Sequence, residues 1–210
     1  MTTSADTTPR KLPPSPARRR RARQLRLLTL RLVWGLGLLG LLAYTLWEPG
    51  RWPLKLGAWV LLTLLADEAG GWFGYAGVAL GSLPWLVTQA AVQTATQPAV
   101  QSAAQALPGQ WYVITPLIGG ALLAALVVKH SGGPLVIPFA GVLFALPVLL
   151  TWRLVPSLDS TLSLPGNHTF LKVSLGMAAL GLGFSFLRQV VGVLLRWRQE
   201  RPETLTPPQP

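Results

Sequence analysis

The sequence predicts an all-α fold, a polytopic membrane bundle with six transmembrane helices, and three observations carry this prediction. Apolar residues make up 50% of the chain and charged residues only 12%, with a mean hydropathy of +0.44. Soluble domains carry about 25% charged residues. Apolar runs of a length suited to crossing a bilayer recur along the chain. Basic residues gather beside the first and the last of these runs.

The first apolar run extends from Leu27 to Trp47 and directly follows a cluster of arginines. A helix over this run would be about 31 Å long at 1.5 Å per residue, which matches the roughly 30 Å hydrocarbon core of a bilayer. Arginine-rich flanks stay on the cytoplasmic side during insertion. The sequence therefore predicts an uncleaved membrane anchor whose N-terminal side faces the cytoplasm.

Five further apolar runs complete the predicted bundle. They are Leu54 to Ala66, Trp72 to Val92, Trp111 to Val128, Pro134 to Trp152 and Phe170 to Leu195. The run from Leu54 is short for a span and is bounded by Asp67 and Glu68, so it is the weakest of the six. The transmembrane domain then covers residues 26–197, between a disordered basic tail at 1–25 and a proline-rich tail at 198–210.

An even number of spans returns the C-terminus to the cytoplasm, and the basic residues agree with that. Nine of the 18 lysines and arginines lie between Arg10 and Arg31, and three more follow the last span. Five spans, the alternative, would leave one basic cluster outside. We expect a plasma (inner) membrane protein with both termini cytoplasmic, and the composition is typical of a GC-rich bacterium. The net charge of +11 then reflects topology and contact with anionic lipid headgroups, not nucleic-acid binding.

Two hairpins of the chain resemble each other, which indicates a parallel internal duplication. Residues 59–71 read WVLLTLLADEAGG and residues 121–133 read ALLAALVVKHSGG. Residues 76–88, AGVALGSLPWLVT, correspond to residues 140–151, AGVLFALPVLLT, with a single gap. Chance alignment of common membrane residues is the alternative, and the sequence alone leaves both open.

The duplication would give the paired helices matching packing faces and matching kinks. Gly77 and Gly81 in one copy correspond to Gly141 and Ala145 in the other, and small residues one turn apart let helices approach closely in lipid. Pro84 and Pro147 would kink the two helices at corresponding depths. Such kinks would fit a shared central cavity, although simple shaping of the helices is the favoured interpretation.

Ionisable residues near the ends of the predicted spans are the candidate functional residues, because charge is costly in lipid. Asp67 and Glu68 occupy the repeat positions of Lys129 and His130, so a salt bridge could tie the hairpins together. Two solvated turns whose charges never meet are slightly favoured. Arg188 could pair with Asp67 or Glu68 or bind an anionic headgroup or substrate, but snorkelling to the cytoplasmic surface is the favoured interpretation.

Neither catalytic chemistry nor a cofactor is expected. The chain has no cysteine, its two histidines lie in different turns on opposite sides of the membrane, and no metal-ligand cluster or phosphate-binding glycine loop is present in the sequence. We therefore expect a protein that is not an enzyme, with no catalytic, metal or cofactor-binding residues.

Two functions are compatible with these observations. The favoured one is a small-solute transport component or channel-like subunit. The second is a non-catalytic structural or scaffold subunit of a membrane or cell-envelope complex. Both are compatible with a homo-oligomer or with other membrane proteins as partners, and the sequence identifies no small-molecule ligand.

Overall fold

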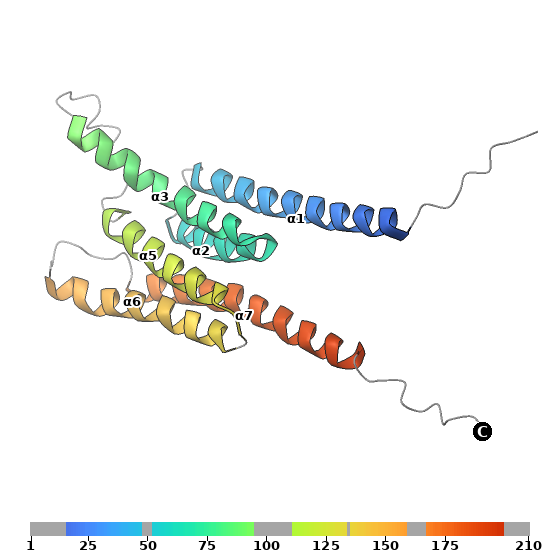
Figure 1. Ribbon diagram of the computed structural model, residues 1–210. Coiled ribbons are helices and arrows are strands. Elements are labelled where there is room, and N and C mark those ends of the chain that lie inside the picture. Colours follow the sequence, from blue (N-terminus) through green and yellow to red (C-terminus); the bar gives the residue numbers. More distant parts are fainter. Residues whose placement is uncertain (1–15, 48–51, 95–110, 134, 159–166, 200–210) are drawn as a thin grey trace, which may run out of the picture.

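The computed structural model describes residues 16–47, 52–94, 111–133, 135–158 and 167–199, and this part of the chain folds into six α-helices (Figure 1). They are α1 (Pro16–Trp47), α2 (Trp52–Ala69), α3 (Gly71–Thr94), α5 (Trp111–His130), α6 (Val136–Leu158) and α7 (Asn167–Gln199). The described residues contain no β-strand. The prediction of an all-helical protein is confirmed.

The first helix begins earlier than expected, because α1 already starts at Pro16. The prediction of a disordered tail is wrong for residues 16–25, which are helical. Proline fits the first position of a helix, and the alanine, arginine, glutamine and leucine residues that follow are strong helix formers. The predicted tails at 1–15 and 200–210 lie outside the described residues.

Within the described residues, three helices are long and apolar enough to cross a membrane. The segments are Arg20–Trp47 in α1, Val136–Leu154 in α6 and His168–Arg198 in α7, and α5 contains a shorter apolar helix, Ile114–His130. In α2, Lys55, Asp67 and Glu68 place three charges within 18 residues. The structure thus supports a membrane-associated helical bundle with three clear candidate spans.

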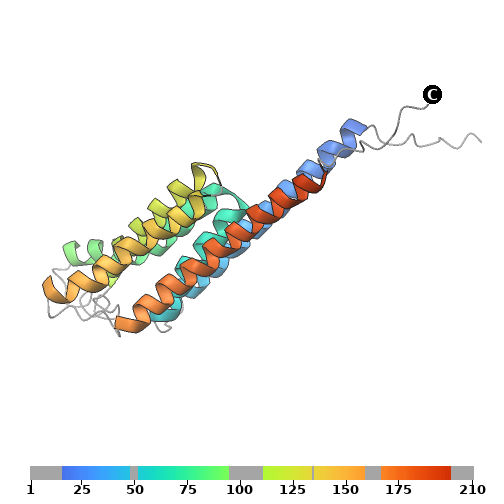
Figure 2. The same cartoon turned by 90° about the horizontal axis from the view of Figure 1, so that it is seen from below.

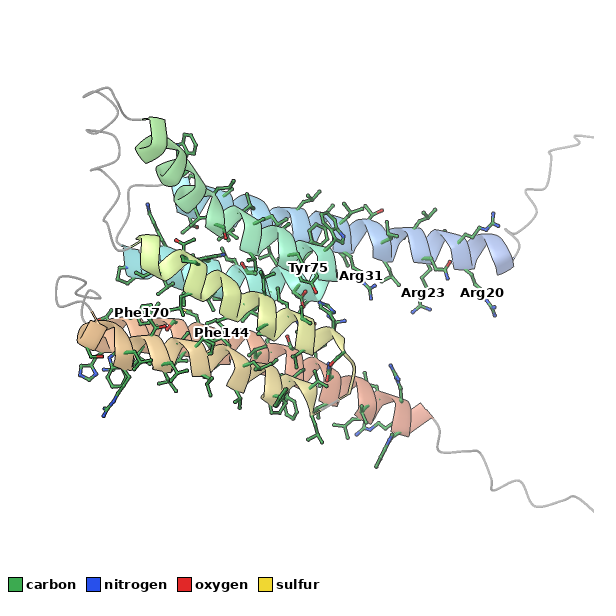
Figure 3. All side chains as sticks on the ribbon, turned by 60° about the vertical axis from the view of Figure 1, so that its left-hand side comes forward. Arg20, Arg23, Arg31, Tyr75, Phe144 and Phe170 are labelled. Atoms are coloured by element: carbon green, nitrogen blue, oxygen red, sulfur yellow. The ribbon has the colours of Figure 1, made fainter. Side chains whose placement is uncertain are left out.

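Helix α2 lies at the centre of the bundle, in contact with α1, α3, α5 and α7. The remaining contacts join α1 to α3, α3 to α5, α5 to α6 and α6 to α7. At one end, α1 and α7 both project beyond the four other helices (Figures 1 and 2). Because α1 begins and α7 ends there with arginine-rich turns, we call it the basic end. Arg20, Arg23 and Arg31 stand exposed on α1 (Figure 3).

The contact between α2 and α3 is a row of side chains set against glycines. Trp59, Thr63 and Asp67 are four residues apart, so they lie on one face of α2. A Cβ atom added to Gly81 would lie 1.9 Å from Trp59 Cε2, and one added to Gly77 would lie 2.7 Å from Thr63 Oγ1. Gly77 and Gly81 therefore leave the space that Thr63 and Trp59 occupy.

Two further contacts extend this row. Trp59 Nε1 donates a hydrogen bond to the backbone oxygen of Gly77 at 3.1 Å. A Cβ atom on Gly74 would lie 2.5 Å from Asp67 Oδ1. The glycines of α3 thereby leave room for Asp67 at the end of α2. Its carboxylate there contacts residues of α5, which are described below.

The second hairpin does not repeat this packing. A Cβ atom on Gly141 would approach only Leu182 of α7, at 3.8 Å, and Gly141 and Ala145 line a cavity between α6 and α7. The glycines of α3 thus pack within their own hairpin, whereas the corresponding residues of α6 face a different helix. Duplication of the hairpin stays a prediction that packing does not support.

The predicted kinks lie within continuous helices, because α3 runs through Pro84 and α6 runs through Pro147. The side chain of Pro84 lies outside the described residues. Pro147 is half-buried and does not line the cavity between α6 and α7 or the cavity bounded by α1, α2 and α7. A shared central cavity therefore has no support from Pro147.

Candidate functional site

Three helices bring charged side chains together at the basic end. Helix α2 ends in Asp67 and Glu68, helix α5 ends in Lys129 and His130, and α7 passes both with Arg188. Together with Ser185 of α7, these side chains form the ionic cluster. Every candidate ionisable residue named from the sequence belongs to it.

Asp67 is held by both ionisable residues of α5. Lys129 Nζ lies 2.6 Å from Asp67 Oδ2, and His130 Nε2 lies 2.8 Å from Asp67 Oδ1. The Asp67 side chain is 0% exposed and that of Lys129 is 7% exposed. Both oxygens of the buried carboxylate therefore have a partner, as a buried charge requires.

Glu68 is held mainly from α7. Arg188 Nη1 donates to Glu68 Oε2 at 2.5 Å and to the backbone oxygen of Glu68 at 2.9 Å. Ser185 Oγ donates to Glu68 Oε1 at 2.5 Å, and Lys129 forms an ion pair with the same carboxylate. Lys129 thus bridges the two acidic residues and joins α5 to α2, while Arg188 joins α7 to α2.

These contacts correct two interpretations favoured from the sequence. The hairpin ends are not separate solvated turns, because Lys129 and His130 contact Asp67 directly. Arg188, although about half exposed, does not simply snorkel, because its guanidinium binds Glu68. Both favoured interpretations assumed isolated helices, and the packing of α5 and α7 against α2 replaces water with protein partners.

The turns that follow α2 and α5, next to the ionic cluster, depend on glycine. Only Gly70 separates α2 from α3, and a Cβ atom on Gly71 would lie 2.9 Å from His130 Cε1. After His130, Gly132 and Gly133 adopt φ values of 88° and 108°, which side chains other than glycine rarely adopt. The Gly-Gly pair of the second hairpin is therefore required by the backbone conformation of the turn after α5. In the first hairpin, Gly71 of the Gly-Gly pair lies close to His130.

Ser185 is the member of the cluster that sequence reasoning missed. It is 1% exposed and lies three residues before Arg188, so both side chains reach α2 from neighbouring turns of one face of α7. A serine between Phe184 and Phe186, at helical spacing from an arginine inside an apolar run, was the available signal.

The arrangement favours holding helices together over catalysis. Each carboxylate oxygen of Asp67 and Glu68 has a partner, which is a lysine, an arginine, the His130 ring or a hydroxyl, so neither acid is left free to act as a base. Within the part of the chain that the structure describes, no group of three or more His, Cys, Asp and Glu side chains could hold a metal ion. The chain matches no protein-family model, no curated protein and no solved structure.

Proposed function

We propose that this protein is a non-catalytic structural subunit of a membrane complex, with six membrane-embedded helices and both termini on the cytoplasmic side. The observation that carries the proposal is the position of the cavities in the bundle. Two cavities of the described part are lined almost entirely by apolar residues, one between α6 and α7 and one bounded by α1, α2 and α7, whereas Thr63 and Asp67 of α2 are buried in the bundle. These two cavities offer apolar surfaces to other membrane helices.

Two of these cavities lie on surfaces that another helix could contact. One, of about 460 Å³, lies between α6 and α7 and includes the small residues Gly141, Ala145, Ala178, Ala179 and Gly183. The other, of about 670 Å³, is bounded by α1, α2 and α7. In lipid, helix association depends on close packing at small residues, so the first surface suits contact with a partner helix.

Small-solute transport is the second candidate, and the ionic cluster is the observation that favours it. Charged groups within a membrane bundle commonly mark ion or substrate pathways. Breaking the pairs made by Lys129 and Arg188 would release α5 and α7 from α2 at the basic end. In a transporter, these pairs would form the cytoplasmic gate.

The two functions predict different behaviour of the purified protein. A structural subunit should copurify with the same membrane partners in a fixed ratio, and Ala179→Trp, which fills the α6–α7 surface, should abolish that association. Gly120→Trp is the control, because a Cβ atom on Gly120 meets nothing within 4 Å. A small solute that raises the melting temperature in detergent, with partner association unchanged by Ala179→Trp, would contradict the proposal and favour transport.

A further inference from the structure

The cavity bounded by α1, α2 and α7 is a trough with three apolar sides. Its floor is one face of α2, where Leu54, Ala58 and Leu61 recur at helical spacing. Leu41 of α1 lies on one side and Met177 of α7 on the other. Within the described part of the chain, α1 and α7 both contact α2 but do not contact each other. The face of α2 between them therefore has no helix packed against it.

The cavity extends from one membrane boundary to about the middle of the proposed bilayer. Along α2 its lining runs from Pro53, the second residue of the helix, to Leu62, a length of about 14 Å at 1.5 Å per residue. One leaflet supplies half of the roughly 30 Å hydrocarbon core, or about 15 Å. Beyond Leu62, α7 lies directly against α2, because a Cβ atom on Gly181 would lie 2.8 Å from Cβ of Leu64. The cavity thus matches the length of lipid chains in the leaflet away from the basic end.

The width of the cavity suits a lipid chain better than a helix. A volume of about 670 Å³ spread over about 14 Å gives a mean cross-section of about 50 Å². A helix with its side chains is about 10–12 Å across, which gives a cross-section of about 80–110 Å². A partner helix could therefore lie over the cavity but not fill it, and the side chains of the floor would lack dispersion contacts. A flexible hydrocarbon chain can enter the cavity and supply those contacts.

The charge at the outer end of the cavity complements the phosphate of such a lipid. Lys55 lies three residues before Ala58 and seven before Leu62, so it shares their side of α2. Lys55 is half-buried and forms no ion pair within the described residues. The acidic residues of α2, Asp67 and Glu68, lie at the opposite end of the helix. In the described part of the chain, a phosphate at this boundary therefore meets a lysine and no carboxylate.

We propose that this cavity binds one acyl chain of a phospholipid whose phosphate lies beside Lys55. The bound chain fills the space over Gly57 and Ala58 and joins α1 to α7 across α2. Thr45, the polar residue of the lining, donates its hydroxyl to the backbone oxygen of Leu41 at 2.8 Å. The hydrocarbon chain therefore meets no unpaired hydroxyl there. The site requires only that the bundle lies in a bilayer, and it is independent of which of the two functions above is right.

The test measures lipid binding to the full chain in an uncharged detergent by native mass spectrometry. The probes are phosphatidylglycerol, its single-chain lyso form, diacylglycerol, which lacks phosphate, and glycerol phosphate, which lacks acyl chains. We expect both phosphatidylglycerols to saturate one site per chain with similar apparent Kd, diacylglycerol to bind more weakly, and glycerol phosphate not to bind. Lys55→Gln should raise the Kd for phosphatidylglycerol about fivefold, which corresponds to about 1 kcal/mol per lysine beside anionic headgroups.

Filling the cavity after the protein has folded avoids a bulky substitution that could prevent folding. The chain has no cysteine, so Ala58→Cys introduces a single thiol on the cavity floor, and N-phenylmaleimide then modifies it. Modification should raise the apparent Kd for lyso-phosphatidylglycerol about tenfold. Gly120→Cys is the matched control, because a Cβ atom on Gly120 meets nothing within 4 Å. Its modification should leave the Kd unchanged.

Equal binding of lyso-phosphatidylglycerol by Ala58→Cys before and after modification would overturn the proposal. Equal binding of phosphatidylglycerol by Lys55→Gln and the unmodified chain would overturn the assignment of the phosphate to Lys55. A disulfide-linked dimer of Ala58→Cys in native membranes would show that a second copy covers the cavity. A copurifying protein that the modification displaces would identify a partner helix as the occupant. Either of these last two results would also overturn the proposal.

Discussion

Replacing Lys129 by methionine is expected to lower the free energy of unfolding by about 3–5 kcal/mol, the usual cost of removing one partner from a buried ion pair. Methionine retains the apolar stem but leaves Asp67 and Glu68 without their shared cation. The carboxylate of Asp67 is fully buried, so water cannot replace the lost partner. Chemical unfolding in detergent, followed by tryptophan fluorescence, measures the change.

Two companion variants make this result specific to the cluster. Lys172→Met removes an exposed lysine near the start of α7, and we expect a change within about 0.5 kcal/mol. Adding Asp67→Asn to Lys129→Met removes the unpaired charge, so the double variant should be more stable than Lys129→Met alone. Equal stability of Lys129→Met and Lys172→Met would show that the ion pairs contribute nothing.

Gly81→Ala is expected to destabilise the bundle by about 3 kcal/mol, the upper end of the usual range for overpacking. The added Cβ atom would lie 1.9 Å from the ring of Trp59, which is completely buried and hydrogen-bonded to α3. Neither the ring nor the helix backbone can move without disturbing the row of contacts that ends at Asp67. Thermal unfolding in detergent and the yield of monodisperse protein both report the effect.

The control variant for Gly81→Ala is expected to change the stability in the opposite direction. Gly120→Ala adds the same methyl group to α5, where nothing lies within 4 Å. Alanine favours the helix by about 0.5–1 kcal/mol over glycine, so Gly120→Ala should be neutral or stabilising. Combining Gly81→Ala with Trp59→Leu should recover part of the lost stability, and failure of both expectations would contradict the described packing of α2 against α3.

Hydropathy predicted the positions of the helices, because an apolar run long enough to cross a bilayer can be recognised without knowing which helices pack beside it. The centres of all six described helices fall within the apolar runs that predicted them. Helix ends were less predictable, and α1 extends into residues 16–25 because helix-forming residues continue past the apolar run. Composition alone could not distinguish a polar helix from a disordered tail.

The partners of each helix could not be predicted in the same way. In lipid, both the packed and the exposed faces of a helix are apolar, so a hydrophobic stripe does not reveal which neighbour it meets. The central position of α2 was missed for this reason. A usable signal was present, because Trp59, Thr63 and Asp67 recur every four residues opposite the glycines of α3.

The ionic cluster was predicted in composition but not in arrangement. Opposite charges at matching repeat positions identified Asp67, Glu68, Lys129 and His130 as possible partners, yet solvated turns were slightly favoured because exposed ion pairs contribute little. Burial changes that balance, and burial results from the packing of α5 and α7 around α2. Arg188 was misjudged for the same reason, since its partner lies on a helix 120 residues away in the chain.

The central claim is that α2 lies inside the bundle with α7 packed against its charged end, and disulfide formation tests this most directly. The chain has no cysteine, so an introduced pair is the only one that can react. A Cβ atom on Gly181 would lie 2.8 Å from Cβ of Leu64, closer than the roughly 3.8 Å of a disulfide, so the two helices need to separate by only about 1 Å for the bond to form. In native membranes under mild oxidation, Leu64→Cys with Gly181→Cys should cross-link efficiently, whereas Leu64→Cys with Gly192→Cys should not. Absence of the first disulfide, or equal yields from both pairs, would contradict the account.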